Sequence, residues 1–341
     1  MRHGWIAVAV ALALGRVALG GPLDPMQVAS DAQWVVHADT NAMQASSVAQ
    51  KAYHALVEQH PLGKVGEAIL DKSRKIVGMD PRSDLHGITA YGKTLGREEG
   101  VLIIVADVDQ ALLAEKVQRA PDYRMTMHGP YTVVSWTHVD PRGRRPVAGA
   151  FYKSNVIVFS GSPEEVKAAI DVMDGKAPCL DAASPLATAT PAGAALVARA
   201  VRIGQARLPG NPPLLKQLDT LRIVVGEDKG TSFAHARLSV KSPQVAAHIK
   251  DVLVGARALG LLHAGDDPKE KALAEAIKVS ADSDSVKVDF EAPADDVWEH
   301  LRKDIRRILE MHKTAGSNAL WDWSAGARPG RQRGLVDSGQ R

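Results

Sequence analysis

The chain has almost no cysteine: Cys179 is the only one among 341 residues. A single cysteine excludes an internal disulfide and a C-x-x-C motif, and none lies near the N-terminus to accept a lipid. Aromatic residues make up only 4% of the chain, whereas hydrophobic residues together make up 45%. We therefore expect mainly aliphatic cores, stabilised by burial without covalent links.

The common signatures of catalysis and metal binding are also missing. The sequence contains no G-x-S-x-G and no H-E-x-x-H, and its 12 histidines are scattered. Cys179 lies in a segment where no base is expected to activate it. These patterns predict no catalytic residue, no metal site and no cofactor.

Long apolar runs are absent too, since a membrane-spanning helix needs about 20 consecutive apolar residues. The longest run, within MRHGWIAVAVALALGRVALG, follows the basic Arg2, is interrupted at Arg16 and ends in small residues. This pattern is typical of a secretory signal peptide cleaved near Gly20. We expect a secreted or periplasmic protein without an integral membrane anchor after cleavage.

The charge of the chain is nearly balanced. Loss of residues 1–20 removes Arg2 and Arg16 and no acidic residue, so the formal net charge falls from +3 to +1. Nucleic acids and anionic membranes attract proteins through a concentrated positive field. The composition therefore favours a protein or small-molecule ligand over a nucleic acid.

The periodicity of the rest predicts an α+β fold of two similar domains. In each, hairpins form a mostly antiparallel sheet, with helices packed on one face. We place the signal peptide at 1–20, the first domain at 21–173, a Pro- and Ala-rich linker at 174–193, the second domain at 194–313 and a disordered tail at 314–341. The repeated order of hairpins and of helices begun at Ser-Pro or Ala-Pro suggests an internal duplication.

One segment imitates a nucleotide-binding loop. Residues 87–94, GITAYGKT, match GxxxxGK[ST], and an apolar strand ending at Asp107 follows. A phosphate-binding loop has to start a helix, but Ile, Thr, Ala and Tyr favour extended backbone and leave no room for a helix before residue 101. We therefore expect a hairpin and no nucleotide.

The candidate ligand-binding residues are His37 and Asp39, in WVVHADTNAMQAS. Alternation predicts a strand over 34–39 with Trp34 and Val36 facing the core and His37 and Asp39 on the polar face. A helix over about 41–56 should follow, and Asp39 stands where its N-cap is needed. Two interpretations remain: a structural role for both residues, or contact of both with one ligand.

Four segments resemble a family of uncharacterised secreted bacterial proteins: WVVHADTNAMQAS, DPRSDLHGITAYG, PDYRMTMHGPYTVVSW and AFYKSNVIVFSGSPEEVKAAIDVMDG. The resemblance covers about residues 30–180 and is weaker beyond. It implies export and a mixed α+β fold, and it carries no assigned activity.

Taken together, the sequence favours an exported, non-enzymatic binding or structural interaction module. The alternative is an exported hydrolase whose site is assembled from dispersed residues, with His37, Asp39, His86 and His138 as the first to examine.

The signal peptide gives a direct prediction. Mass spectrometry of the exported protein should find a chain that begins near Gly21 and carries no lipid. A membrane-bound product that still contains Met1 to Gly20 would refute it.

Overall fold

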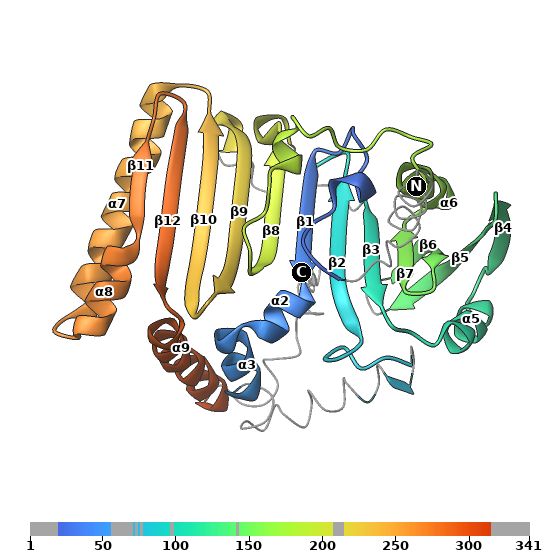
Figure 1. Cartoon of the computed structure of the whole chain (residues 1–341), viewed down its shortest axis with the longest axis horizontal. Coiled ribbons are helices and arrows are strands. Elements are labelled where there is room, and N and C mark those ends of the chain that lie inside the picture. Colours follow the sequence, from blue (N-terminus) through green and yellow to red (C-terminus); the bar gives the residue numbers. More distant parts are fainter. Residues whose placement is uncertain are drawn as a thin grey trace, which may run out of the picture.

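The computed structural model describes residues 20–55, 71, 74–75, 78–95, 99–140, 143–206 and 215–314. They form a single 12-stranded sheet in the order β11-β12-β10-β9-β8-β1-β2-β3-β7-β6-β5-β4, with every pair antiparallel (Figure 1). The predicted α+β class with antiparallel hairpins is confirmed. Residues 1–19 of the predicted signal peptide, the predicted end of the helix at about residue 56, and nearly all of the predicted disordered tail lie outside the described residues.

The first half of the sheet follows the predicted order closely. Its elements are β1 (Trp34–Asp39), α2 (Thr40–Ala45), α3 (Ser47–Tyr53), β2 (Leu85–Gly92), β3 (Val101–Ala106), α5 (Gln110–Gln118), β4 (Arg124–His128), β5 (Tyr131–Asp140), β6 (Gly143–Lys153), β7 (Val156–Ser160) and α6 (Pro163–Met173). A short 3-10 helix, η1 (Pro25–Gln27), precedes β1. Strand β2 contains the GxxxxG segment and pairs with β3, which confirms the hairpin.

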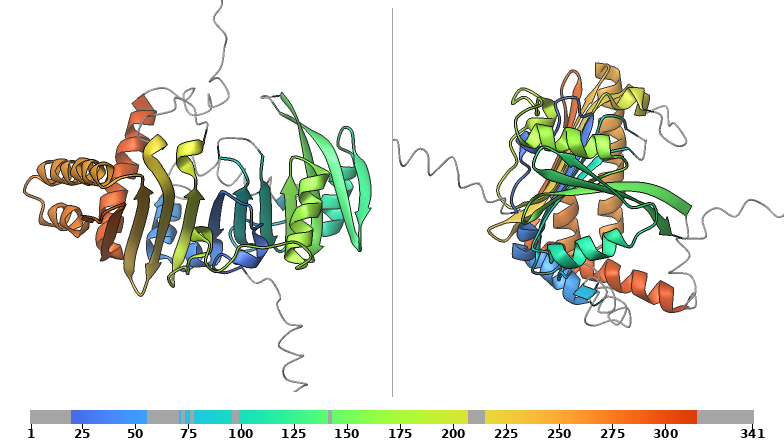
Figure 2. Two further views of the ribbon diagram at one scale, coloured as in Figure 1. Left: turned by 90° about the horizontal axis from the view of Figure 1, so that it is seen from above. Right: turned by 90° about the vertical axis from the view of Figure 1, so that its right-hand side faces the viewer.

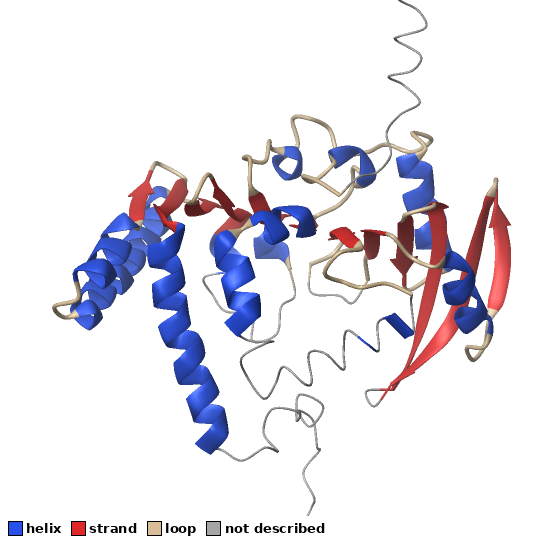
Figure 3. Cartoon of the chain, turned by 60° about the horizontal axis from the view of Figure 1, so that its bottom comes forward, coloured by secondary structure: helices blue, strands red, loops and turns tan. Residues whose placement is uncertain are grey.

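The second half contains β8 (Ala194–Val201), β9 (Leu218–Asp228), β10 (Thr231–Val240), α7 (Pro243–Ala264), α8 (Pro268–Ala276), β11 (Lys278–Ala281), β12 (Ser285–Pro293) and α9 (Ala294–Thr314). Figure 3 shows α7, α8 and α9 grouped at one end of the sheet. Among the helices that the structure describes, none combines the length and apolarity required to cross a membrane.

The two halves meet where β1 pairs with β8. Trp34 lies opposite Ala200 and His37 opposite Val197, so the hydrogen-bonded ladder runs without interruption from one half to the other. The segment predicted as a linker also packs on this sheet, because Leu180 and Leu186 are buried. The halves are therefore joined by main-chain pairing as well as by the connecting segment.

Two hydrophobic cores lie on opposite faces of this one sheet. The first, which includes Val35, Ile103 and Ile170, lies under α6 and the segment that precedes β1. The second, which includes Ala200, Ile249 and Val286, lies under α7, and Trp34 packs against it. We call these the α6 face and the α7 face; the view from above in Figure 2 shows the strands as one layer between them.

The predicted orientation of β1 is wrong. Val35, His37 and Asp39 are buried on the α6 face, whereas Val36 is 38% exposed and Trp34 is only partly buried. The reason is tertiary: residues Leu23, Val28 and Ala32, which precede the strand, fold back and cover the face that carries the histidine. Alternation alone could not reveal this cover.

The single helix expected after β1 is two helices. The chain is extended at Ser46, whose hydroxyl caps α3 and also donates to Glu227 of β9 at 2.7 Å. Glu227 accepts further bonds from the amides of Ser47 and Val48, both at 3.1 Å. The Glu227 carboxylate of the second half thus accepts the free N–H groups at the start of α3 in the first half. These groups are free because the helix is interrupted at Ser46.

The prediction that the helices of the first half pack on one face of the sheet is wrong. Helix α6 buries Val166 and Ile170 on the α6 face. Helix α5 lies on the other side, where Leu113 and Val117 line an apolar cavity of about 270 Å³ with Trp136 and Phe159. The short α5 has an apolar stripe that can pack on either face, so its sequence does not choose between them.

The corrected orientation of β1 gives a matched pair of variants. Val35→Asp should unfold the protein in urea far more readily than Val36→Asp. Burying an unpaired carboxylate at the fully covered Val35 should cost about 3 kcal/mol or more, whereas a carboxylate at position 36 can reach water. Equal losses in the two variants would contradict the orientation.

Candidate functional site

His37 is a buried histidine with both ring nitrogens occupied. The side chain is 6% exposed; Nδ1 lies 2.9 Å from Thr89 Oγ1 on β2, and Nε2 lies 2.8 Å from the carbonyl oxygen of Gly21. A carbonyl oxygen can only accept, so Nε2 carries the proton and donates it. Nδ1 then accepts from the Thr89 hydroxyl. The protein itself fixes the tautomer and the ring orientation.

Burial favours the neutral form of this imidazole. Loss of solvation lowers the pKa of His37 below its ordinary value; the bond to Gly21 and the charge of Asp39 oppose this shift, and Arg199 reinforces it. The neutral ring is the form that can both donate to Gly21 and accept from Thr89. Hydrogen bonding and burial therefore select the same protonation state.

Asp39, the second predicted ligand residue, serves the local fold. It is 7% exposed and its Oδ1 accepts from the amide of Ala42 at 3.0 Å, which caps α2. The expected N-cap is confirmed. The structure places Asp39 and His37 on the same face of β1, but it does not bring them together at one cavity.

A cavity of about 450 Å³ lies beside His37. Its sheet side is formed by His37, Thr89, Val105 and Val156, and Lys153 and Met173 lie at its other end. His37 and Thr89 are polar, Val105 and Val156 are aliphatic, and Tyr152 and Lys153 add polar groups at the other end. The volume lies in the range of small-molecule sites, which combine an apolar wall with a few polar groups.

The opposite wall is the segment Gly20–Gln27, which includes η1. The carbonyl of Gly20 accepts from Asn41 Nδ2 at 3.2 Å, and a Cβ on Gly20 would lie 2.2 Å from the backbone oxygen of His86. Together with the bond from His37 to Gly21, these contacts hold the segment against the sheet. Sequence reasoning missed this wall because we assigned it to the start of the mature chain and looked for no site there.

The other histidines considered for a hydrolase site do not converge on His37. His86 packs against Gly20, and its Nε2 pairs with Asp107 at 2.9 Å. His138 lies on β5, and four strands of the sheet separate β5 from β1. Two other polar residues that line the cavity, Thr89 and Lys153, belong to no sequence motif. Thr89 lies on β2, next to β1, whereas Lys153 lies at the end of β6, and only the order of the strands brings it to the same cavity.

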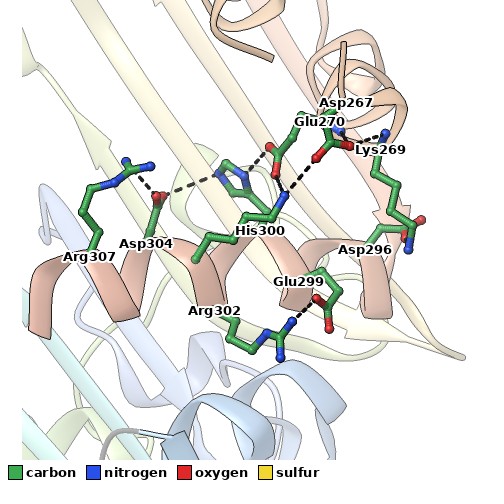
Figure 4. Close-up of polar contacts among 10 residues, drawn as sticks. Asp267, Lys269, Glu270, Asp296, Glu299, His300, Arg302, Asp304 and Arg307 are labelled. Carbon is green, nitrogen blue, oxygen red and sulfur yellow. Dashed lines mark hydrogen bonds and ion pairs between the residues drawn. The ribbon is translucent and has the colours of Figure 1, made fainter. Parts of the chain in front are cut away.

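A second cavity, of about 610 Å³, lies between α7, α8 and α9. Its charged residues pair with one another: His300 Nδ1 lies 2.6 Å from Glu270, and Lys303 lies 2.8 Å from Glu270 and 3.0 Å from Asp267 (Figure 4). These contacts join α9 to α8. Because the charges are already satisfied, we interpret this cluster as a structural connection between helices.

Within the described parts of the chain, His, Cys, Asp and Glu side chains form no group of three that could hold a metal ion. Met125, Met127 and His128 on β4 also do not form one, since the methionines are 61% and 60% exposed and His128 turns to Asp171 at 2.8 Å. Successive residues of a strand point to opposite faces, so His128 does not share a face with Met127.

Comparison with known proteins finds no matching family model and no matching curated protein. Among solved structures, crystal form I of TP0453 covers 82% of this chain and 97% of its own, with 9% identity and a TM-score of 0.43. Crystal form III of TP0453 covers 81% and 97%, with 10% identity and a TM-score of 0.43.

The buried histidine predicts an acid-sensitive fold. A histidine whose folded pKa is lowered stabilises the protein above its unfolded pKa of about 6.5, and this contribution is lost as the pH falls below that value. The free energy of unfolding should therefore decrease between about pH 7 and pH 5.

The matched control compares His37→Gln with His248→Gln, which changes an exposed histidine on α7. Urea titrations at several pH values should show a smaller dependence on pH in His37→Gln than in the natural chain or in His248→Gln. An unchanged pH dependence in His37→Gln would contradict the assignment.

Proposed function

We propose that this chain is an exported, non-enzymatic binding protein and that a small organic molecule binds in the cavity beside His37. The observation that supports this most is the composition of the cavity. Buried His37 and Thr89 lie at one end, Val105, Val156 and Met173 form an apolar wall, and Lys153 contributes positive charge; the carboxylate in the lining, Asp24, is engaged in capping η1. A ligand with an apolar body and a polar or anionic end matches that arrangement.

Binding is favoured over hydrolysis by the state of the histidine. A general base needs a free nitrogen within reach of the proton that it removes. Both nitrogens of His37 are engaged by Thr89 and Gly21, so the imidazole orders the wall of the cavity. In this proposal His37 positions Gly20–Gln27, and the ligand contacts that segment and the sheet.

Export is part of the same proposal. It rests on the signal-like residues 1–20 and on the resemblance to secreted bacterial proteins. The expected cleavage point, near Gly20–Gly21, lies in the wall of the cavity, so the new N-terminus would lie beside the ligand. The carbonyl of Gly21 stays in the mature chain and keeps its bond to His37.

We further propose that the chain is an internal duplication of two similar domains. In the first half, sequential strands β1, β2 and β3 are followed in space by β7 and β6; in the second half, β8, β9 and β10 are followed by β12 and β11. In each half, helical sequence follows the third strand: α5 follows β3, and α7 and α8 follow β10. A further helix follows the last strand of each half in the chain, α6 after β7 and α9 after β12. The additional hairpin β4–β5 extends only the first half.

Filling the cavity tests the proposed binding site. Met173→Trp should place a large ring in the cavity and abolish the thermal stabilisation produced by small molecules that a screen identifies with the natural chain. Met127→Trp introduces the same ring at a position of β4 that is 60% exposed and lines none of the three cavities described above, so it should leave those responses intact. Amide signals of Gly87, Thr89 and Lys153 in heteronuclear NMR spectra should shift with the natural chain. Ligands that stabilise both variants equally would contradict the site.

A further inference from the structure

Four basic residues lie side by side across the second half of the sheet. The registers place Arg199 of β8 opposite Arg222 of β9, Arg222 opposite Arg237 of β10, and Arg237 opposite Lys287 of β12. Directly opposed residues of antiparallel strands share a face, and neighbouring strands lie about 4.8 Å apart. We call these four residues the basic row.

The basic row carries a cost in stability. Like charges on directly opposed residues repel one another and destabilise a sheet. Burial, together with the charge of Arg222, lowers the pKa of Arg199. Within the described chain, Arg199 bonds only to the carbonyl of Leu186 at 2.7 Å and the hydroxyl of Thr190 at 2.9 Å, so no carboxylate neutralises it.

Arg222 and Arg237 make no hydrogen bond or ion pair to any other residue that the structure describes. Arg237 is exposed, and Arg222 is partly exposed. Lys287 has one acidic neighbour, Asp282, at 3.3 Å. Three cations therefore reach the surface of this sheet, and only Lys287 is paired with a carboxylate; Asp289 and Glu291, further along β12 on the same face, pair with His235. In a chain of nearly balanced charge, such a row is a local feature and does not follow from composition.

The row lies on the α6 face of the second half, where the described helices do not cover it. Helix α7 packs on the other side, against Leu221, Leu238 and Val286, and α8 and α9 contact β12. Next to the row, Thr220 donates to Ser239 at 2.9 Å, and Ser239 lies opposite Ser285. The Ser239 hydroxyl donates to no residue that the structure describes. On the other side of the row, His235 holds Asp289 at 2.9 Å.

This chemistry fits tetrahedral oxyanions arranged in a line. Guanidinium groups bind phosphate and sulfate through paired N–H donors, and adjacent hydroxyls add further donors. Proteins that bind single-stranded nucleic acid usually add aromatic platforms for the bases. The residues beside the row are Thr220, Ser239, Val224 and His235. The one aromatic ring among them, that of His235, is stacked on the buried Phe233 and bonded to Asp289, and no tryptophan or tyrosine adjoins the arginines.

We propose that the basic row is a second binding site, which takes a linear polyanion bearing phosphate or sulfate groups. Arg222, Arg237 and Lys287 contact successive oxyanions over about 10 Å, two strand spacings. Arg199, covered by the segment at Leu186, adds its charge from beneath. The site lies on the second half of the sheet, whereas the His37 cavity lies on the first half. Binding at the basic row therefore does not require a ligand in the His37 cavity.

The test measures affinity for two probes, inorganic polyphosphate and heparin, in the full chain and in the double variant Arg222→Gln/Arg237→Gln. The natural chain should bind at least one probe, and the probe preferred identifies the oxyanion. The variant should bind about tenfold more weakly or worse, and the slope of log affinity against log salt should fall by between about one and two. Its melting temperature should stay the same or rise, because the repulsion is relieved.

The control variant Arg302→Gln/Arg306→Gln removes the same charge from α9 and should bind as the natural chain does. Binding lost equally in both variants would mean a non-specific effect of net charge and would overturn the proposal. Absence of binding to both probes would overturn it too, as would stronger binding to oligo-dT or to vesicles rich in anionic lipid. A large loss of stability in the arginine variant would show that the row is structural.

Discussion

One continuous sheet has to bury two hydrophobic cores that lie on opposite faces. The change of face occurs at β1 and β8: Val35 and Val197 belong to one core, while Ala200 belongs to the other and Trp34 packs against it. The α6 face is therefore covered in the first half of the sheet, and the α7 face is covered in the second half. Part of each face in the remaining half carries no long helix. The His37 cavity lies on the covered part of the α6 face, between the sheet and the segment Gly20–Gln27. The basic row lies on the uncovered part of the same face.

The cavity depends on an irregular segment rather than on regular elements. Gly20–Gln27 contributes a single short 3-10 helix, yet it forms a whole wall, and its position is set by one imidazole, one asparagine and a close approach of glycine to backbone. Buried polar residues of this kind stabilise one arrangement only when every donor and acceptor is paired. His37 meets this condition through Thr89 and Gly21.

Local patterns predicted most of the elements, because apolar alternation and turn residues determine them. The strand at 34–39, the hairpin at 87–94 with the apolar strand after it, and the helices begun at Ser-Pro were located from such signals alone. Pairing between distant strands was not accessible: nothing in β9 and β12 indicates that Arg222 and Lys287 lie in one row with Arg199. The prediction of which face of β1 points inward failed for the same reason. Val35 and Val36 are equally apolar, and only the segment that covers Val35 in the folded structure distinguishes them.

The position of β1 also affects the order in which the molecule can be assembled. During synthesis from the N-terminus, β1 can pair with β2 early, but its other partner, β8, emerges only after the whole first half. Until then β1 is an edge strand with unpaired backbone groups, and such edges readily pair with other chains. Contacts between residues so distant in sequence form slowly. Closing the centre of the sheet is therefore a late event in folding, and the first half has to persist with an open edge until β8 arrives.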